Sequence, residues 1–245
     1  MLPPRPTWLP EASALRDFYG QTTAYSYYRL QVTDYIARLL TAAGSTEALD
    51  VIDVGSGDGY LGAVLQTYRP ATRVTGVETH RRELTRPGFE PVVFDGLHLP
   101  FPDGSFDVAV LSNVLHHADD QPALFAETCR VTRRRVIVKD HLASSFADRW
   151  KLAVLDVLGN RRFGADTQGD YLDRAGWNEL FATVPRAIVS WHEGLSFRTG
   201  PLAVAFGNAL EIMFAVDLAS SRDSSCPATI APSEESCHAG IARAH

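Results

Sequence analysis

The sequence predicts a doubly wound α/β fold, in which helices cover both faces of a mostly parallel sheet. The first indication is an apolar run at 49–54, rich in β-branched residues, that breaks directly into glycines at 55, 57 and 59. The second is the helical pattern that follows at 60–68. The third is the repeated alternation of buried strands with helical segments as far as residue 141. Such sheets bind ligands at the carboxyl ends of their strands.

Length and charge narrow the classes of protein. A chain of 245 residues with 45% hydrophobic content suffices for one large domain. The net charge of -6 and the pI near 5.7 disfavour RNA and DNA as partners, because these require clustered basic surface. Residues 1–10 contain too many prolines for a signal peptide, and no apolar run approaches the roughly 20 residues that span a bilayer. We therefore expect a cytoplasmic protein without a membrane segment.

The cysteines do not predict a disulfide framework or a metal site. Cys129, Cys226 and Cys237 are few and scattered, so we expect free thiols. Cys226, Cys237 and His238 fall short of the four ligands of a closed zinc site. The sequence therefore predicts no metal.

The N-terminal region, 1–44, is predicted to be an irregular arm followed by helices. A helix at 25–43 places apolar residues on one face, and Gly44 is a natural stop. The apolar face consists of Tyr28, Val32, Tyr35, Ile36, Leu39 and Leu40. Aromatic residues are also dense here: Phe18, Tyr19, Tyr25, Tyr27 and Tyr28. They form either a lid over a cofactor or a plain helical cover of the sheet.

The remaining elements follow in order along the chain. Strands are predicted at 73–77, 90–94, 106–111, 135–138, 186–191 and 209–218, and helices at 121–132, 145–158 and 171–182. The connection 80–88 is short and charged, so its helix should be rudimentary. The helix at 145–158 has one apolar face: Phe146, Trp150, Ala153, Val154, Val157 and Leu158. The insertion at 142–170 is either a substrate cover or a peripheral helix, and 219–245 has the composition of a flexible tail.

The glycine spacing helps to select the cofactor. After Gly55 and Gly57, a dinucleotide fingerprint would need its third glycine at position 60, which is Tyr60. The pattern acidic-x-Gly-x-Gly-x-Gly fits instead, from Asp53 to Gly59. Glu78, which ends the second strand, can accept two hydrogen bonds from a ribose diol. The sequence therefore predicts a nucleoside-type ligand at this loop.

Motifs further along the chain indicate which protein family the sequence resembles. Asp95 follows the third strand, and the stretches Leu-Pro-Phe-Pro-Asp-Gly-Ser-Phe-Asp-Val at 99–108 and Ser-Asn-Val-Leu-His-His at 112–117 come next. Together with the glycine loop and Glu78, they resemble the motifs of class I S-adenosylmethionine (SAM) methyltransferases that act on small molecules, over about 49–120. This resemblance implies a Rossmann-like sheet of seven strands, with an antiparallel last strand, and a SAM-binding domain at 45–218.

The resemblance also implies the cofactor contacts. Gly55 and Gly57 would meet the methionine portion of SAM, Glu78 the ribose and Asp95 the adenine amino group. Ser112 and Asn113 would lie beside the sulfonium. The full predicted set is Asp53, Gly55, Ser56, Gly57, Gly59, Glu78, Thr79, Asp95, Gly96, Ser112 and Asn113.

The predicted chemistry is an in-line displacement, in which the enzyme positions donor and acceptor and can remove a proton. Histidine suits the proton acceptor because its ordinary pKa is near 6.5. The candidates are His117 and His141, with His116 and Asp140 behind them; for His141, a structural role is equally open.

Missing motifs limit the acceptor. No Asn/Asp-Pro-Pro-aromatic motif follows the fourth strand, no Pro-Cys nucleophile is present, and Asp140 alone is a poor match to a metal-assisted catechol site. We therefore expect O-, N- or C-methylation of a small organic molecule. Two alternatives stay open: a non-methylating reaction such as cyclisation on the same fold, and a nicotinamide-dependent oxidoreductase. The sequence does not predict the oligomeric state.

Overall fold

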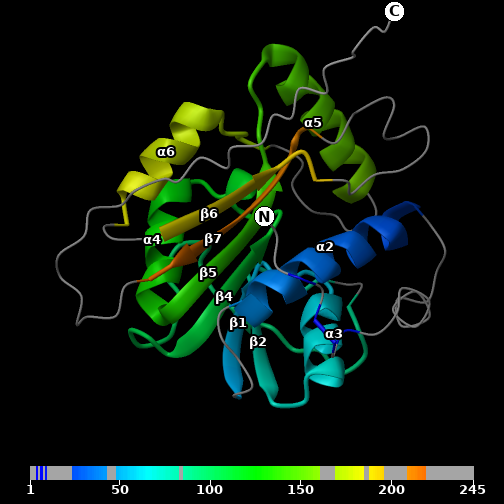
Figure 1. Cartoon of the computed structure of the whole chain (residues 1–245), viewed down its shortest axis with the longest axis vertical. Helices are drawn as coiled ribbons and strands as arrows, with labels where there is room; N and C mark the ends of the chain where they lie inside the picture. The colour runs from blue at the N-terminus through cyan, green and yellow to red at the C-terminus, as the bar shows by residue number, and fades with distance from the viewer. Residues whose placement is uncertain are drawn as a thin grey trace, which may run out of the picture.

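A seven-stranded sheet with the order β3-β2-β1-β4-β5-β7-β6 organises the described part of the chain (Figure 1). In this computed structural model, the structure describes residues 24–42, 48–82, 85–160, 169–184, 188–195 and 209–218, together with Pro4, Pro6, Thr7 and Leu9. The strands are β1 Leu49–Val54, β2 Thr72–Glu78, β3 Val92–Val93, β4 Phe106–Ser112, β5 Thr132–His141, β6 Ile188–Glu193 and β7 Glu211–Asp217. The helices are α2 Ala24–Ala42, α3 Tyr60–Tyr68, α4 Gln121–Val131, α5 Phe146–Asn160, α6 Arg174–Ala182 and the 3₁₀ helix η1 Leu115–His117.

The strand directions confirm the predicted fold. Strands β3, β2, β1, β4 and β5 pair in parallel, whereas β7 runs antiparallel to both β5 and β6. After β1 the chain builds β2 and β3 on one side of it and then crosses to the other side of β1 to form β4 and β5. This change of direction opens a crevice at the carboxyl end of β1, where open α/β sheets bind ligands.

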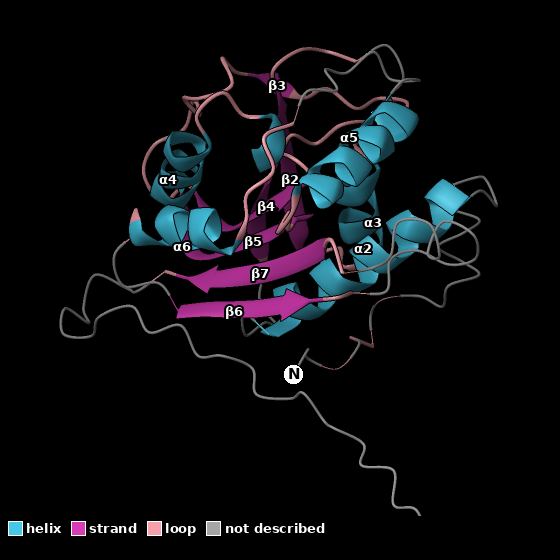
Figure 2. Cartoon of the chain, turned by 90° about the horizontal axis from the view of Figure 1, so that it is seen from above, coloured by secondary structure: helices cyan, strands magenta, loops and turns pink. Residues whose placement is uncertain are grey.

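Helices cover both faces of the sheet, as Figures 1 and 2 show from two directions. On one face, α2 and α3 pack on alternate strand residues, in a cluster that joins Ile36 and Leu65 to Val51, Val108 and Ile137. On the other face, α4 and α6 pack on the intervening residues, in a cluster that includes Ile52, Ala109, Phe125, Val136 and Trp177. Buried strands therefore supply apolar side chains to both faces, which explains their continuous apolar runs.

Several boundaries differ from the prediction. The third strand is only Val92–Val93, at the edge of the sheet, rather than 90–94. Strand β5 is longer than 135–138 and includes the polar residues up to His141. Helix α6 begins at Arg174 rather than at 171, because the Asp173 side chain accepts a hydrogen bond from the Gly176 amide and caps the helix there.

Helix α5 turns its apolar face outward. Phe146 is 85% exposed and Trp150 63% exposed, whereas the residues of this helix that pack inward include Leu152 and Asp156. The prediction grouped the apolar residues correctly, but the face that contacts the protein is a different one. Helix α5 packs through Leu152 and Leu155 on a small apolar cluster and through Asp156 on His116, so the spacing of its most apolar residues did not identify its inner face.

Part of the prediction lies outside the described residues. This applies to Phe18 and Tyr19, to 161–168, to Cys226 and Cys237, and to 219–245. Within the described residues, no helix combines the length and the apolar content needed to cross a membrane.

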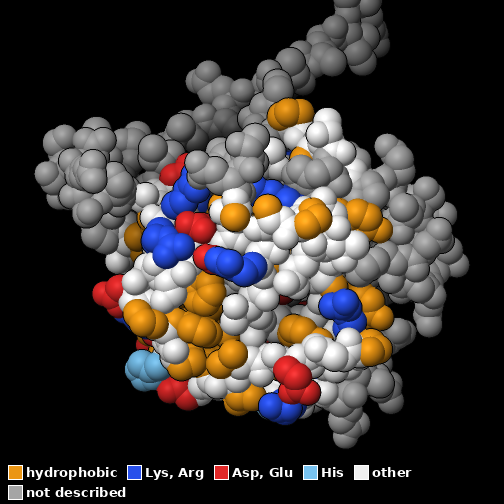
Figure 3. Space-filling model, turned by 90° about the horizontal axis from the view of Figure 1, so that it is seen from below, with side chains coloured by type: hydrophobic (Ala, Val, Ile, Leu, Met, Phe, Trp, Pro, Cys, Tyr) orange, Lys and Arg blue, Asp and Glu red, His pale blue; other side chains and the backbone are white. Residues whose placement is uncertain are grey.

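The edge opposite the crevice carries paired charges. Among the described residues, Arg73 pairs with Asp50, Arg133 with Asp107 and Arg135 with Asp217. Figure 3, which views the molecule from below, shows basic and acidic side chains interspersed on this face. The described part of this face therefore offers no broad basic surface of the kind that nucleic acid requires.

Candidate active site

The glycine loop lies directly at the carboxyl end of β1. Gly55, Gly57 and Gly59 all have positive φ angles, of 67°, 61° and 78°. A Cβ atom on Gly55 would lie 2.5 Å from Val114 Cγ2, and one on Gly59 would lie 2.4 Å from Phe89 Cγ, whereas one on Gly57 would meet no atom of the described residues within 4 Å. Gly55 and Gly59 are thus required by packing, and Gly57 faces open space where a ligand can approach the backbone.

Glu78 connects this loop to the end of β2. Its Oε1 accepts a hydrogen bond from the Gly57 amide at 2.6 Å and lies 3.1 Å from Arg82 Nη2. The Glu78 residue is only 3% exposed. The carboxylate predicted to hold a ribose therefore also fixes the shape of the loop, and Arg82 is a contact that sequence reasoning missed.

Two adjoining cavities form a cleft along the strand ends, and both are lined by Gly55, Arg82 and Asn113. The first, of about 160 Å³, is also lined by Tyr28, Asp53, Ser56, Gly57 and Ser112. The second, of about 610 Å³, is also lined by Glu78, Thr79, Asp95, Gly96 and His117. The structure thus brings ten of the eleven predicted cofactor residues to one cleft; Gly59 lines a cavity behind the loop instead.

Asn113 separates the two cavities and is fixed from both sides. Its backbone has a positive φ of 58°, its Nδ2 donates to the Tyr28 hydroxyl at 3.1 Å, and its Oδ1 accepts from Lys139 Nζ at 2.5 Å. Lys139 is fully buried and pairs with Glu211 at 2.5 Å. Burial lowers the pKa of Lys139, but Glu211 and Tyr28 outweigh burial and raise that pKa. A charged network below the cleft thus holds Asn113 in place.

The two predicted aspartates differ in protonation. Burial, followed by the charges of Glu78 and Asp58, raises the pKa of Asp53 from 3.8 to about 8. Hydrogen bonds from the His98 amide and ring and from the Leu97 amide lower the pKa of Asp95 to about 2. Within the described residues, no cation thus lowers the pKa of Asp53, whereas the Asp95 carboxylate is ionised and accepts the hydrogen bonds of its own turn.

Helix α2 closes the first cavity. The Arg29 guanidinium pairs with the Asp58 carboxylate and lies 5.5 Å from the centroid of the Tyr60 ring. The Tyr28 ring packs against Lys139 Nζ at 5.1 Å. Tyr28 belonged to the predicted aromatic group, but Arg29 did not stand out in the sequence, because its partner lies 29 residues away.

The predicted catalytic residues gather at the same edge of the sheet. His116 Nδ1 lies 2.6 Å from Asp140 Oδ1, and the His116 ring centroid lies 4.0 Å from that of His117 and 5.1 Å from that of His141. Of these four residues, only His117 lines either cavity of the cleft. His141 and Asp140 lie beneath it and are buried.

The two buried histidines have opposite pKa shifts. Burial lowers the pKa of His116, but the carboxylates of Asp140 and Asp156 outweigh burial and raise that pKa to about 9. Burial and the charges of Lys139 and His116 lower the pKa of His141 well below 6.5. At neutral pH, His116 therefore favours its charged form and His141 its neutral form.

Asp156 and Tyr171 are functional candidates that the sequence analysis missed. Asp156 Oδ2 lies 3.4 Å from His116 Nε2 and accepts a hydrogen bond from the Tyr171 hydroxyl. The Tyr171 ring stacks on the His116 ring with centroids 5.2 Å apart. The only signal was a lone acidic residue at helical spacing from Leu152, which by itself does not indicate a site.

Part of the chain is similar in sequence to known methyltransferases. Residues 52–138 match a family profile described as a methyltransferase domain. The chain is 40% identical over 174 residues to an uncharacterised methyltransferase of Mycobacterium sp. (strain JLS). The aligned region covers 64% of this chain and 64% of that protein. The chain is 28% identical over 102 residues to a ubiquinone/menaquinone biosynthesis C-methyltransferase of Desulfotalea psychrophila, over 39% of this chain and 42% of that protein. The chain thus spans less than two thirds of the length of these curated relatives.

A solved structure shows the same fold. The geranyl diphosphate C-methyltransferase of Streptomyces coelicolor A3(2), in complex with S-adenosyl-L-homocysteine, superposes with a TM-score of 0.52 at 14% identity, over 86% of this chain and 95% of that chain. Residues 52–138 thus match a methyltransferase domain, and the strand order and the solved structure show the fold of the class I SAM-dependent methyltransferases, whose cofactor is S-adenosylmethionine.

Proposed function

We propose that this protein binds SAM in the cleft between α2 and the strand ends and transfers the methyl group to a small organic molecule. The observation that supports this most strongly is the convergence of ten predicted cofactor residues on the two adjoining cavities. The amino-acid portion of SAM lies in the first cavity, where, among the described residues, no cation pairs with Asp53 and no atom covers the Gly57 backbone. The adenosine portion lies in the second cavity, beside Glu78 and Asp95.

This orientation puts the sulfonium next to Asn113, because Asn113 lines both cavities. An in-line displacement needs the acceptor on the far side of the methyl group, so holding both molecules in line is the main catalytic task. Asn113 is suited to this task, since Tyr28 and Lys139 fix its side chain. Where the acceptor must lose a proton, His117 is the predicted acceptor of that proton that lines the cleft, with His141 behind it.

The acceptor enters from the side of α5. Helix α5, Phe146–Asn160, lies over the carboxyl end of the sheet in Figure 1, and we assign the predicted insertion 142–170, to which this helix belongs, as the substrate cover. Helix α2 forms the opposite wall and is the part of the predicted N-terminal lid that the structure describes. Two of the proteins that the chain resembles are C-methyltransferases, so carbon acceptors are the first to test.

A ligand screen tests the cofactor. SAM and S-adenosylhomocysteine should raise the melting temperature at micromolar concentration, whereas NAD and NADP should not, because a ligand that binds only the native state stabilises it. A nicotinamide response without a SAM response would overturn the proposal. A second experiment supplies SAM with a labelled methyl group and a cell extract separated by size. Label in the small-molecule fraction supports the proposed acceptor class, and label only in protein or RNA contradicts it.

A further inference from the structure

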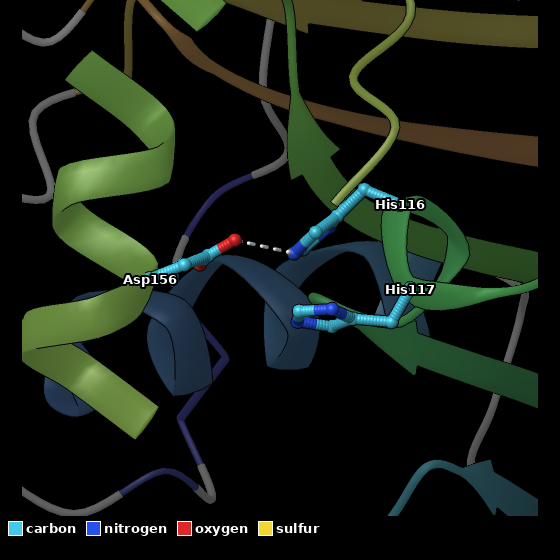
Figure 4. A group of neighbouring side chains, drawn as sticks. All are labelled: His116, His117 and Asp156. Carbon is cyan, nitrogen blue, oxygen red and sulfur yellow. Dashed lines mark ion pairs between the residues drawn. The ribbon is translucent and has the colours of Figure 1, made fainter. Parts of the chain in front are cut away.

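Three side chains converge beside the cleft from two distant parts of the chain. His116 and His117 lie on η1, and Asp156 reaches them from α5, as Figure 4 shows. His116 Nε2 and Asp156 Oδ2 are 3.4 Å apart, and one donor atom from each of the three residues lies within 4.8 Å of the others. Two imidazoles and a carboxylate thus face one small volume.

Hydrogen-bond partners outside the cluster orient both His116 and Asp156. Asp140 Oδ1 lies 2.6 Å from His116 Nδ1, which leaves Nε2 as the nitrogen that faces Asp156. The Tyr171 hydroxyl donates a hydrogen bond to the Asp156 carboxylate. In protein metal sites, a ligating histidine almost always donates its other ring N–H to a carboxylate, carbonyl or water, and ligating carboxylates are hydrogen-bonded in turn. This cluster has both features.

The cluster contains a buried nitrogen without a hydrogen bond. His116 is only 3% exposed, and its Nε2 makes no hydrogen bond of good geometry within the described residues. Asp156 Oδ2 lies 3.4 Å from this nitrogen. Asp140 Oδ2 is also buried, and it likewise makes no hydrogen bond within the described residues. Unpaired buried polar atoms are unfavourable, so a ligand that contacts them stabilises the fold.

The charges favour a cation. Asp140 and Asp156 place two carboxylates around the His116 ring, and Lys139 beside them is already paired with Glu211 at 2.5 Å. A proton on His116 balances one of these carboxylates, and a dication balances both.

We propose that His116, His117 and Asp156 bind one divalent transition-metal ion. Metal–nitrogen and metal–oxygen bonds of about 2.0–2.2 Å at tetrahedral angles separate two ligand atoms by about 3.3 Å, close to the 3.4 Å between His116 Nε2 and Asp156 Oδ2. The wider span that includes His117 closes by a side-chain rotation. Imidazole ligands suit Zn²⁺, Co²⁺ or Fe²⁺ better than Mg²⁺. The sequence did not predict this site, because Asp156 is 39 residues from His117.

The proposed metal ion links helix α5, part of the proposed substrate cover, to the wall of the cleft. It connects α5 to η1, and His117 also lines the cavity that contains Glu78 and Asp95. An acceptor oxygen that occupies a remaining position on the ion would lose its proton more readily. In the metal-free protein, that task stays with His117.

Metal binding is tested directly on the full chain, without SAM. Titration of the chelator-treated protein with Co²⁺ should give one equivalent of binding and d–d absorption bands, and Zn²⁺ should displace the Co²⁺ and raise the melting temperature. Mg²⁺ should do neither. Asp156→Asn, which preserves the shape of the side chain, and His116→Ala should each weaken binding by at least 100-fold, and Asp140→Asn by about 10- to 100-fold.

Two controls complete the experiment. His192→Ala removes a histidine from β6 and should leave metal affinity unchanged. The double variant Cys226→Ser with Cys237→Ser should also bind one equivalent. The proposal is overturned if the wild type binds no stoichiometric Co²⁺ or Zn²⁺, if Asp156→Asn and His116→Ala bind like the wild type, or if the double cysteine variant loses the metal. Because SAM is absent, these results do not depend on the proposed methyl transfer.

Discussion

The amide of Gly57 donates a hydrogen bond to Oε1 of Glu78 at 2.6 Å, so the glycine loop and the end of β2 act as one unit. The same carboxylate lies in the wall of the larger cavity. Glu78 therefore shapes the loop, and we propose that it also accepts hydrogen bonds from the ribose of the cofactor. Substitutions at this position should affect both stability and cofactor affinity.

Glu78→Ala should weaken the binding of S-adenosylhomocysteine tenfold or more. The ribose would lose a charge-assisted acceptor worth about 1.5–3 kcal/mol, and the Gly57 amide and Arg82 would lose their partner. Isothermal calorimetry measures the affinity, and the melting temperature reports the loss of loop contacts. Glu90→Ala, which removes an exposed glutamate paired with Arg81, is the matched control and should bind normally. Equal affinity of Glu78→Ala and the wild type would remove Glu78 from the site.

Gly57→Val should abolish cofactor binding while the protein still folds. A Cβ atom at Gly57 meets no atom of the described part of the chain within 4 Å, so the added side chain would occupy the space assigned to the ligand. The φ of 61° still makes any side chain there unfavourable, by roughly 1–2 kcal/mol. Gly194→Val, at the end of β6, separates the effect of strain from that of blockage, since Gly194 has a φ of 63° and a Cβ atom there would also meet no described atom within 4 Å.

Thermal unfolding and calorimetry on both glycine variants distinguish strain from blockage. Both should melt at a lower temperature than the wild type, and only Gly57→Val should lose S-adenosylhomocysteine binding. Normal binding by Gly57→Val would show that the ligand does not back onto this part of the loop.

The sequence predicted the central fold because its signals are local. The run at 49–54 supplies apolar side chains to both faces, which only a strand between two helical layers requires. The glycines and the acidic residues at the strand ends fall at one edge because the strands are parallel. The cleft followed from that rule, although Arg29 and Arg82 did not.

The inner face of α5 and the contacts of Asp156 were not predicted from the sequence, and both for the same reason. Phe146 and Trp150 have the spacing of a buried face, yet α5 packs through Leu152 and Asp156, because Asp156 meets His116 and Tyr171. Such polar contacts join residues far apart in the chain, and periodicity does not record them. The His116–Asp156 pair therefore became visible only in three dimensions.

Asp53→Asn should stabilise the free protein while it weakens cofactor binding. The pKa of Asp53 is raised from 3.8 to about 8 in the folded state, so the folded protein holds a proton that the unfolded chain has released over this range. Stability from this group is therefore complete below about pH 4 and is lost as the pH rises towards 8, by up to about 1.4 kcal/mol per pH unit. The amide side chain of the Asp53→Asn variant does not ionise, so the variant does not lose this stability as the pH rises.

The measurement is the free energy of unfolding of wild type and Asp53→Asn, from urea titrations between pH 5 and 8. The difference in favour of the variant should grow with pH. At pH 8 the variant should nevertheless bind SAM more weakly, because the SAM ammonium group loses its anionic partner. A pH-independent difference in stability would show that Asp53 is ionised in the folded protein throughout this range.

His117→Ala should lower turnover by about 10²- to 10⁴-fold with SAM affinity nearly unchanged, if the acceptor must lose a proton during transfer. Of the four predicted catalytic residues, His117 is the one in the cleft wall, whereas the buried His141 lies behind it with Glu211 3.5 Å from its ring. His141→Ala should therefore cost less turnover than His117→Ala, and His192→Ala, on β6, should cost nothing. Single-turnover rates with the identified acceptor measure the chemical step, and calorimetry measures SAM affinity separately. Near-normal rates in both His117→Ala and His141→Ala would show that positioning alone drives the reaction, as expected for an acceptor that arrives already deprotonated.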